Sequence, residues 1–301
     1  MMEKTFVKTI ASKVFYFGWS IWTRLLSDEA YVKWLYHRFY HKKLDLSHPL
    51  TFQEKLQWIK LYDRKPIYHQ MVDKLGAKEY VSENFGSQYC IPTIGVYHSF
   101  EEIDFDKLPN QFILKPTFDS CSYYICRDKS QLNKKDAKRV LYTHWDHDYS
   151  LWSGEWPYKG LKHRIIAEPL IGTPENIYEY KFFCFNGEPK IYQTCYDRKK
   201  IGGAILRFYD IDGKLLELDD KYHTRTIEVE LPSPKNIETM LKICRQASKD
   251  TYFLRVDFYE VEGKLYSGEF TFFENGGFCE FKPEKYNRIL GDWIKLPTDK
   301  Q

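Results

Sequence analysis

Apolar residues recur at spacings of three and four near the start of the chain, which is the period of a helix with one buried face. The stretch covers residues 5–26, and charged residues such as Lys4, Lys8 and Arg24 fall largely off the apolar stripe. The stripe consists of Val7, Ile10, Val14, Phe17, Ile21 and Leu25. The pattern predicts an amphipathic N-terminal helix.

Helices are also predicted over 51–61, 68–85, 133–142 and 237–248. The first begins with a capping box, because Thr51 is followed by Glu54 three residues later and then by the apolar Leu56 and Ile59. The second should end at Gly86, since glycine adopts the left-handed conformation that closes many helices.

Short apolar runs and turn signals predict strands. Strands are expected over 91–96, 111–115 and 123–126. In the second half, the pairs Asn186-Gly187, Asp212-Gly213 and Glu262-Gly263 separate alternating segments and predict hairpins. We therefore expect an α+β protein with mainly antiparallel pairing in its second half.

The amino-acid composition excludes some classes of protein. The 301 residues carry 45 Lys and Arg against 42 Asp and Glu, a net charge of +3 without a dense basic run, which argues against nucleic-acid binding. The 43% hydrophobic content excludes wholesale disorder. Seven cysteines without a C-x-x-C pair suit reduced thiols in a cytosolic protein.

The first 43 residues carry a net +5 and are rich in Trp and Phe, although the longest uncharged run there, residues 14–23, is too short to span a membrane. It is also followed by a poor cleavage site, so we interpret the protein as not secreted. A Lys-rich helix with Trp and Phe is able to lie in a membrane interface or to pack its aromatic stripe on the core. Both interpretations stay open.

One candidate site is the loop 117–122, which follows the apolar run ending at Lys115. Lys115 could reach a phosphate as a point charge, while the hydroxyls of Ser120 and Ser122 supply donors. The loop has no glycine and carries Phe118 and Asp119. A hairpin with a solvated lysine is the competing interpretation.

A second candidate is the carboxylate pair Asp257 and Glu269, flanking the turn at 262–263. Two carboxylates on adjacent strands can bind Mg²⁺. A two-residue turn would place them on opposite faces, and a three-residue loop would place them on the same face. Exposed acids on a hairpin are the competing interpretation.

A third candidate is the apolar strand ending at Glu168-Pro169-Leu170, which could form a hinge whose backbone recognises a base, or simply lead into the next hairpin. Three D-x-D triplets, at 104–106, 146–148 and 210–212, are the only support for a glycosyltransferase.

In order along the chain, these segments resemble the TupA-like (teichuronopeptide-biosynthesis) ATP-grasp family of bacterial surface-polysaccharide loci. The resemblance covers about residues 45–297 and rests on the order and spacing of several segments. They are LTFQEKLQWIK at 50–60, DK at 73–74, IP at 91–92, 108–115, YKFFCFNG at 180–187, FYD at 208–210, RVDFY at 255–259, GEFT at 268–271, LGD at 290–292 and KLP at 295–297.

The resemblance implies an ATP-grasp fold with N-terminal helices (1–45), an N-terminal α/β sub-domain (46–108), a small lid sub-domain (109–166) and an antiparallel β-rich C-terminal sub-domain (167–301). It also implies ATP and Mg²⁺ as cofactors. Phosphates or adenine would be bound by Lys115, Ser120, Ser122, Glu168, Leu170 and Lys181. Mg²⁺ would be held by Asp257 and Glu269, with Asn275 or Thr271 near the third position, and Arg255 would stabilise an acyl phosphate.

The function implied by the resemblance is carboxylate–amine ligation. The expected partners are a carboxylated sugar or glycan acceptor and an amine such as an amino acid. The expected location is the cytoplasm, with peripheral membrane contact through residues 5–26. A glycosyltransferase of the same pathway and a non-catalytic binding protein remain alternatives.

Overall fold

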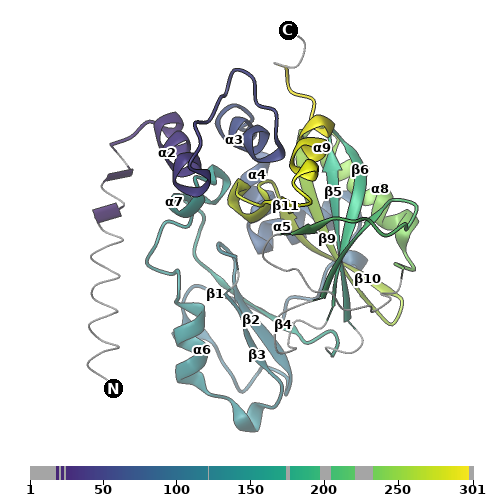
Figure 1. Ribbon diagram of the computed structural model, residues 1–301. Coiled ribbons are helices and arrows are strands. Elements are labelled where there is room, and N and C mark those ends of the chain that lie inside the picture. Colours follow the sequence, from purple (N-terminus) through teal and green to yellow (C-terminus); the bar gives the residue numbers. More distant parts are fainter. Residues whose placement is uncertain are drawn as a thin grey trace.

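A computed structural model of the chain describes residues 18–19, 22–23, 25–120, 122–173, 177–196, 205–220 and 233–297, and it contains two main antiparallel sheets (Figure 1). The predicted helix at 5–26 and Cys121 lie largely or wholly outside these residues. Within the described part, no helix is both long and apolar enough to cross a membrane.

The larger sheet has five strands in the order β10-β9-β5-β6-β7. Two of the predicted turns are confirmed as its hairpin connections. Asn186 and Gly187 both have positive φ between β5 and β6, as Glu262 and Gly263 do between β9 and β10. At the third turn, Tyr209 forms a bridge with Leu215 after β7. The strands are β5 (Ile177–Phe185), β6 (Glu188–Tyr196), β7 (Ile205–Asp210), β9 (Phe253–Val261) and β10 (Lys264–Thr271).

The smaller sheet has the strand order β1-β4-β2-β3 and is covered by helix α6, which buries Ala137 and Leu141 (Figure 1). Its strands are β1 (Gly95–Tyr97), β2 (Phe112–Pro116), β3 (Tyr124–Cys126) and β4 (Ile165–Pro169), and α6 spans Lys134–Leu141. The predicted strand at 91–96 is therefore wrong over 91–94, while the predictions at 111–115, 123–126 and 133–142 are confirmed within a residue or so.

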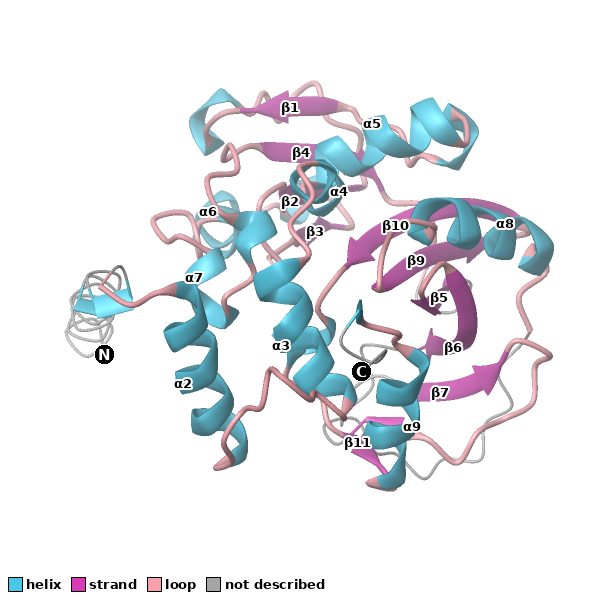
Figure 2. Cartoon of the chain, turned by 90° about the horizontal axis from the view of Figure 1, so that it is seen from above, coloured by secondary structure: helices cyan, strands magenta, loops and turns pink. Residues whose placement is uncertain are grey.

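The remaining helices lie on the five-stranded sheet or on other helical elements. Helix α8 lies along its outer side, and α9 packs against α3 (Figure 2). The helices are α2 (Asp28–Tyr40), α3 (Phe52–Tyr62), α4 (Ile67–Val72), α5 (Lys74–Asn84), α7 (Ser150–Ser153), α8 (Ile237–Ser248) and α9 (Lys285–Trp293). Short elements are η1 (Ser87–Tyr89), η2 (Phe100–Glu102), η3 (Lys129–Gln131), η4 (Trp156–Tyr158), η5 (Glu274–Gly277), β8 (Asp219–Asp220) and β11 (Phe281–Lys282).

The prediction of one helix over 68–85 is wrong, because the chain breaks at Asp73. Asp73 has extended backbone angles, and its carboxylate accepts hydrogen bonds from the backbone N–H groups of Leu75 and Gly76. It therefore acts as the N-cap of a new helix, α5. The helix predicted at 51–61 is confirmed, with both halves of its capping box formed.

The chain builds two large hydrophobic cores. The larger combines α3–α5 with the five-stranded sheet, α8 and α9, and much of it is aromatic; Phe52, for example, packs on Phe185 and Phe253. Among the residues that the structure describes, the members of the smaller core all lie between 97 and 167. The sub-domain predicted over 46–108 contributes to both parts of the structure. Its helices belong to the larger core, whereas its strand β1 pairs with β4 in the smaller sheet. The sub-domain boundaries stay predictions.

Candidate functional site

A β-bulge aligns the two carboxylates that the sequence suggested as metal ligands. The turn at 262–263 has two residues and pairs Val261 with Lys264, a register that would put Asp257 and Glu269 on opposite faces. Between Ser267 and Phe270 the register shifts by one residue, so that Glu269 comes opposite Asp257. The bulge therefore places Asp257 and Glu269 on the same face of the sheet, as a three-residue loop would have done.

Glycine at position 268 permits this bulge. A Cβ atom at Gly268 would lie 3.0 Å from the backbone oxygen of Asp257 and 3.2 Å from its Cβ, which is tight for any side chain. The absence of a side chain lets the bulged strand approach Asp257 closely.

A cluster of charges lies on one face of the five-stranded sheet and consists of the buried Arg255 and Asp257 and the half-buried Lys181. The Arg255 guanidinium donates two hydrogen bonds of 2.7 Å to the two carboxylate oxygens of Asp257 and a third to Glu274. Lys181, opposite Asp257 on β5, has its Nζ 3.5 Å from the Asp257 Oδ2 and 3.7 Å from the Glu179 Oε1. Burial alone would lower the pKa of Arg255, but the two carboxylates outweigh it and raise that pKa.

Asn275, predicted as a metal ligand, is exposed on η5 in a left-handed conformation. Its neighbour Glu274 is the residue that reaches Arg255. Among the side chains that the structure describes, no three from His, Cys, Asp and Glu gather closely enough to hold a metal ion. The structure therefore brings together Asp257 and Glu269, and leaves Asn275 apart at the surface.

The loop 117–122 turns its bulky and acidic side chains inward. Phe118 is 2% exposed and stacks on the His163 ring at a centroid distance of 3.7 Å. Asp119 is also 2% exposed, and its Oδ2 lies 3.0 Å from the His144 Nδ1. The burial of Phe118 and Asp119 holds the loop in position, and the next residue, Ser120, lines a cavity.

A small cavity of about 20 Å³ connects this loop to the bulged strand. Lys74, Ser120, Tyr158 and Glu269 are among the residues that line it. Burial, and next the nearby Glu155, raises the pKa of Tyr158 well above its usual value. The two predicted serines of this loop, residues 117–122 and called the lid loop below, have different surroundings. Ser120 lines the cavity, whereas the Ser122 hydroxyl lies 3.2 Å from the His144 Nδ1.

Glu168 holds two lysines together. Its carboxylate, 2% exposed, is paired with Lys78 and lies 2.8 Å from the Lys115 Nζ. Burial would raise the pKa of Glu168, but the two ammonium groups outweigh it and hold the pKa below its usual value. Burial lowers the pKa of Lys78 in spite of this pairing. The three charges leave one net positive charge at the junction of α5, β2 and β4.

Leu170 directly follows β4 on the segment that leads from the smaller sheet to β5. This position suits a hinge between the two sheets, as predicted for 168–170. The Glu168 side chain, however, is directed to the two lysines.

A buried lysine, Lys60, connects α3 to α7 and to η5. Lys60 on α3 is fully buried, and its Nζ donates to the Gln57 Oε1 at 2.9 Å and to the backbone oxygens of Ser153 at 2.7 Å and Gly276 at 2.5 Å. Burial lowers its pKa to about 7, although Glu155 acts in the opposite direction. Lys60 therefore fixes η5, which carries the Glu274 that contacts Arg255.

Sequence reasoning missed Lys78, Lys60 and His144. Lys74 and Lys78 are one helical turn apart on α5, so an amphipathic reading of that segment would have placed both on one face. The pairing of His144 with Asp119 joins positions 25 residues apart and has no sequence signal.

The D-x-D triplets, by contrast, serve local turns. Asp104 accepts from the backbone N–H of Asp106, and Asp148 accepts from Ser150. Asp210 accepts from the backbone N–H of Lys214. Such contacts are typical of Asp at turns and helix starts.

The sequence profile of the TupA-like ATP-grasp family matches residues 54–295, which include both sheets and every charged residue of the cluster. The chain belongs to the TupA-like ATP-grasp family. This membership confirms the ATP-grasp fold and the α+β class expected from the sequence. No curated protein matches the chain.

Solved structures that match the chain include two D-alanine–D-alanine ligases and an ATP-grasp ligase. The D-alanine–D-alanine ligase from Bacillus anthracis, complexed with ATP, is 17% identical over 67% of this chain and 54% of its own, with a TM-score of 0.40. The D-alanine–D-alanine ligase from Helicobacter pylori is 15% identical over 75% and 61%, with a TM-score of 0.38. The ATP-grasp ligase PsnB, with a precursor variant, Mg and ADP, is 10% identical over 81% and 66%, with a TM-score of 0.42. The TupA-like chain thus spans between about half and two thirds of the length of these proteins.

Proposed function

We propose that the protein is an ATP-dependent carboxylate–amine ligase that forms an amide on a carboxylated sugar of a bacterial surface polysaccharide. The observation that carries the proposal is the bulge that brings Glu269 into register with Asp257, beside Lys181 and Arg255. Glu269 also lines the small cavity that Ser120 of the lid loop lines. Membership of the ATP-grasp family supports this assignment.

ATP would bind between the two sheets. Lys115 and Lys78 with Glu168 keep one net positive charge, which the anionic phosphates of a nucleotide would neutralise. Ser120 and Ser122 would supply donors from the lid loop, and Lys181 would contact phosphate from the five-stranded sheet. The backbone of Glu168 to Leu170 would recognise the adenine edge.

Asp257 and Glu269 would hold Mg²⁺, because both offer hard carboxylate oxygens from adjacent strands on one face. Each Asp257 oxygen accepts one hydrogen bond from Arg255 and keeps a further lone pair for the ion. Two protein carboxylates suffice for this ion when substrate phosphates and water complete its shell. Of the two residues expected near the third position, Thr271 lies on the strand that carries Glu269, whereas Asn275 lies apart at the surface. Bound there, Mg²⁺ would neutralise charge on the phosphates. The residues of the chain would bind the substrates and stabilise the other charges that develop in the reaction.

The reaction would proceed in two displacements. A carboxylate oxygen of the sugar forms a bond to the γ-phosphorus of ATP, and the bond to ADP breaks. The amine nitrogen then bonds to the acyl carbon, phosphate leaves with the oxygen, and the nitrogen loses a proton. Arg255, permanently charged, would stabilise the negative charge on the acyl phosphate and on the oxygen of the second transition state.

The location would be the cytoplasm, where ATP is available. The N-terminal residues 5–26, whose charge and aromatic content suit a membrane interface, would bring the enzyme to a lipid-linked acceptor. Co-sedimentation with liposomes tests this contact, and equal binding by a chain lacking residues 1–26 would contradict it.

Phosphate release from ATP–Mg²⁺ in the presence of paired uronic acids and amino acids tests the ligase, with the amide identified by mass spectrometry. We expect Asp257→Asn plus Glu269→Gln to abolish turnover without loss of fold. Glu284→Gln plus Asp292→Asn, two exposed carboxylates on or beside α9, is the matched control. Full activity of the first double variant would refute the metal assignment. Thermal stabilisation by a UDP-sugar but not by ATP–Mg²⁺ would favour a glycosyltransferase, and stabilisation by ATP–Mg²⁺ without turnover of any pair would indicate a binding protein.

A further inference from the structure

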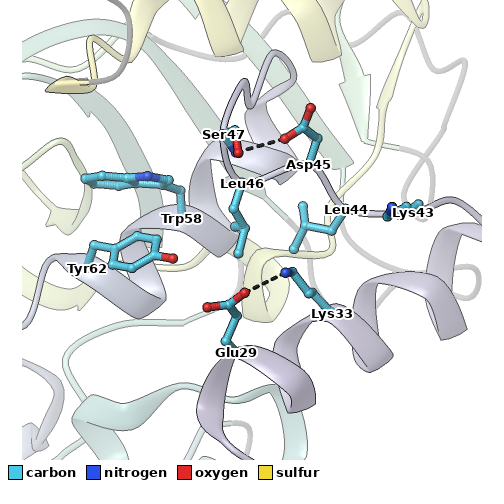
Figure 3. Close-up of a pocket in the computed structure, with 9 residues that line it drawn as sticks. All are labelled: Glu29, Lys33, Lys43, Leu44, Asp45, Leu46, Ser47, Trp58 and Tyr62. Atoms are coloured by element: carbon cyan, nitrogen blue, oxygen red, sulfur yellow. Dashed lines mark hydrogen bonds and ion pairs between the residues drawn. The ribbon is translucent and has the colours of Figure 1, made fainter.

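The structure has a second, larger concavity away from the charge cluster, between α2, the loop that follows it and α3. This α2–α3 groove has a volume of about 550 Å³, within the range of sites for small ligands (Figure 3). It is lined by Glu29, Lys33, Lys43, Leu44, Asp45, Leu46, Ser47, Trp58 and Tyr62.

Two aromatic rings form one wall of the groove. Trp58 and Tyr62 are one turn apart on α3, with ring centroids 4.9 Å apart and an angle of 52° between the rings. The Tyr62 side chain is 51% exposed. Figure 3 shows the phenol of Tyr62 directed across the groove toward Leu46 and Glu29. Trp58 is half-buried, and two rigid rings that are partly open to solvent suit a ligand with an apolar face.

The opposite wall is polar and fixed in position. The Asp45 carboxylate accepts hydrogen bonds from the backbone N–H groups of Ser47 at 2.8 Å and His48 at 3.3 Å. These bonds lower the pKa of Asp45, so the carboxylate stays ionised. Leu44, 2% exposed, packs on Val32 and anchors the loop.

The charges of the groove balance, with two lysines against two acids. Lys33 and Glu29 form an ion pair of 2.5 Å, whereas Lys43 is exposed at the far end of the wall. A balanced wall is unsuited to a polyanion such as a nucleic acid, which requires net positive charge. Aromatic rings opposite an oriented carboxylate instead match a pyranose, which has an apolar C–H face and a rim of hydroxyl donors.

We propose that the α2–α3 groove binds a saccharide with a carboxylate group. A sugar ring packs on Trp58 and Tyr62, its hydroxyls donate to Asp45, and its carboxylate pairs with Lys43. The proposal rests on the proposed function in its choice of an acidic sugar, and it adds a site that holds the acceptor chain outside the ligase centre.

Saturation-transfer NMR with trimers of galacturonate, glucuronate and mannuronate, on the full chain, tests the proposal. We expect at least one trimer to receive saturation, and we expect its apparent affinity to fall about tenfold in Tyr62→Ala and in Lys43→Ala. The matched controls are Phe39→Ala, an exposed aromatic outside the groove, and Lys42→Ala, an adjacent exposed lysine. Binding of none of the trimers, or binding unchanged in Tyr62→Ala, would overturn the proposal. A neutral maltotriose that binds as well as the uronate trimer would overturn the role of Lys43.

The same samples separate this site from the ligase centre. Saturation transfer to the trimer should persist with excess ADP–Mg²⁺, and Tyr62→Ala should keep any thermal stabilisation by ATP–Mg²⁺. Displacement of the trimer by the nucleotide would place it in the ligase centre and overturn the groove assignment. Trimer binding without any response to ATP would support the groove and refute the proposed ligase.

Discussion

Replacing Lys60 by methionine should make the stability of the protein less dependent on pH. The Lys60 ammonium is fully buried, and its pKa is lowered to about 7. In the unfolded chain, lysine titrates near 10.4. Between these values the unfolded state binds more protons than the folded state, so this residue makes the free energy of unfolding rise with pH. Integrated from pH 7 to pH 9, the rise is about 2 kcal/mol.

Lys60→Met removes that rise and leaves three acceptors without their donor. Glu155, whose pKa burial raises, also loses its cation, which makes ionisation of Glu155 still more costly at high pH. Breaking a buried pair at one partner destabilises proteins by about 3–5 kcal/mol. Because wild-type Lys60 is costly to protonate, we expect a loss of about 2 kcal/mol at pH 7 and about 4 kcal/mol at pH 9.

Urea unfolding of both proteins, followed by circular dichroism at pH 7, 8 and 9 and constant ionic strength, measures this difference. Groups that titrate in this range without facing Lys60 contribute equally to both proteins and cancel. Glu155 does not cancel, because the variant removes the cation that favours its ionised form. Glu155→Gln and the double variant complete a cycle, and we expect the double variant to lose less stability than the two single losses combined. A loss that is the same at pH 7 and pH 9 would refute the reasoning.

Thr51→Ala removes the capping box shared with Glu54 and should destabilise the fold by about 1 kcal/mol in urea; a loss below about 0.3 kcal/mol would contradict it. The pKa of Glu168 is held below its usual value, so the stability it contributes is present above its unfolded pKa and falls as the pH drops through the folded one. Glu168→Gln should flatten this acid slope in thermal unfolding between pH 3 and pH 7, and an unchanged slope would count against the ion pairs. Phe118→Ala should cost about 3 kcal/mol locally and speed hydrogen exchange in the loop 117–122, while the exposed Tyr123→Ala should not.

Local patterns in the sequence specified most elements. The helix at 237–248 and the hairpins at 186–187 and 262–263 follow from periodicity and from residues that tolerate positive φ. The break at Asp73 was missed because the apolar period continues across it, and only the cap reveals a new helix. The apolar period alone does not distinguish an Asp on the polar face of one continuous helix from an Asp whose carboxylate caps the N–H groups two and three residues later.

The candidate site was only partly predictable for a related reason. The residue types of Asp257 and Glu269 were readable, but their common face depends on a bulge that no turn signal announces. Asp119 is an acidic residue in the loop expected to hold phosphate, and the structure turns it inward through a contact with His144, 25 residues away in the sequence. Glu168 was assigned from its place at a strand end, whereas its partner Lys78 comes from a helix far away in sequence.

The division of the two cores has a consequence for synthesis on the ribosome. All members of the smaller core lie between residues 97 and 167, so this part can fold soon after it leaves the exit tunnel. The larger core joins Phe52 to Leu290 and Leu296, which are made last. At about 5 to 20 residues per second, the first helices must wait roughly 10 to 50 s for these partners, with their apolar faces open to chaperones.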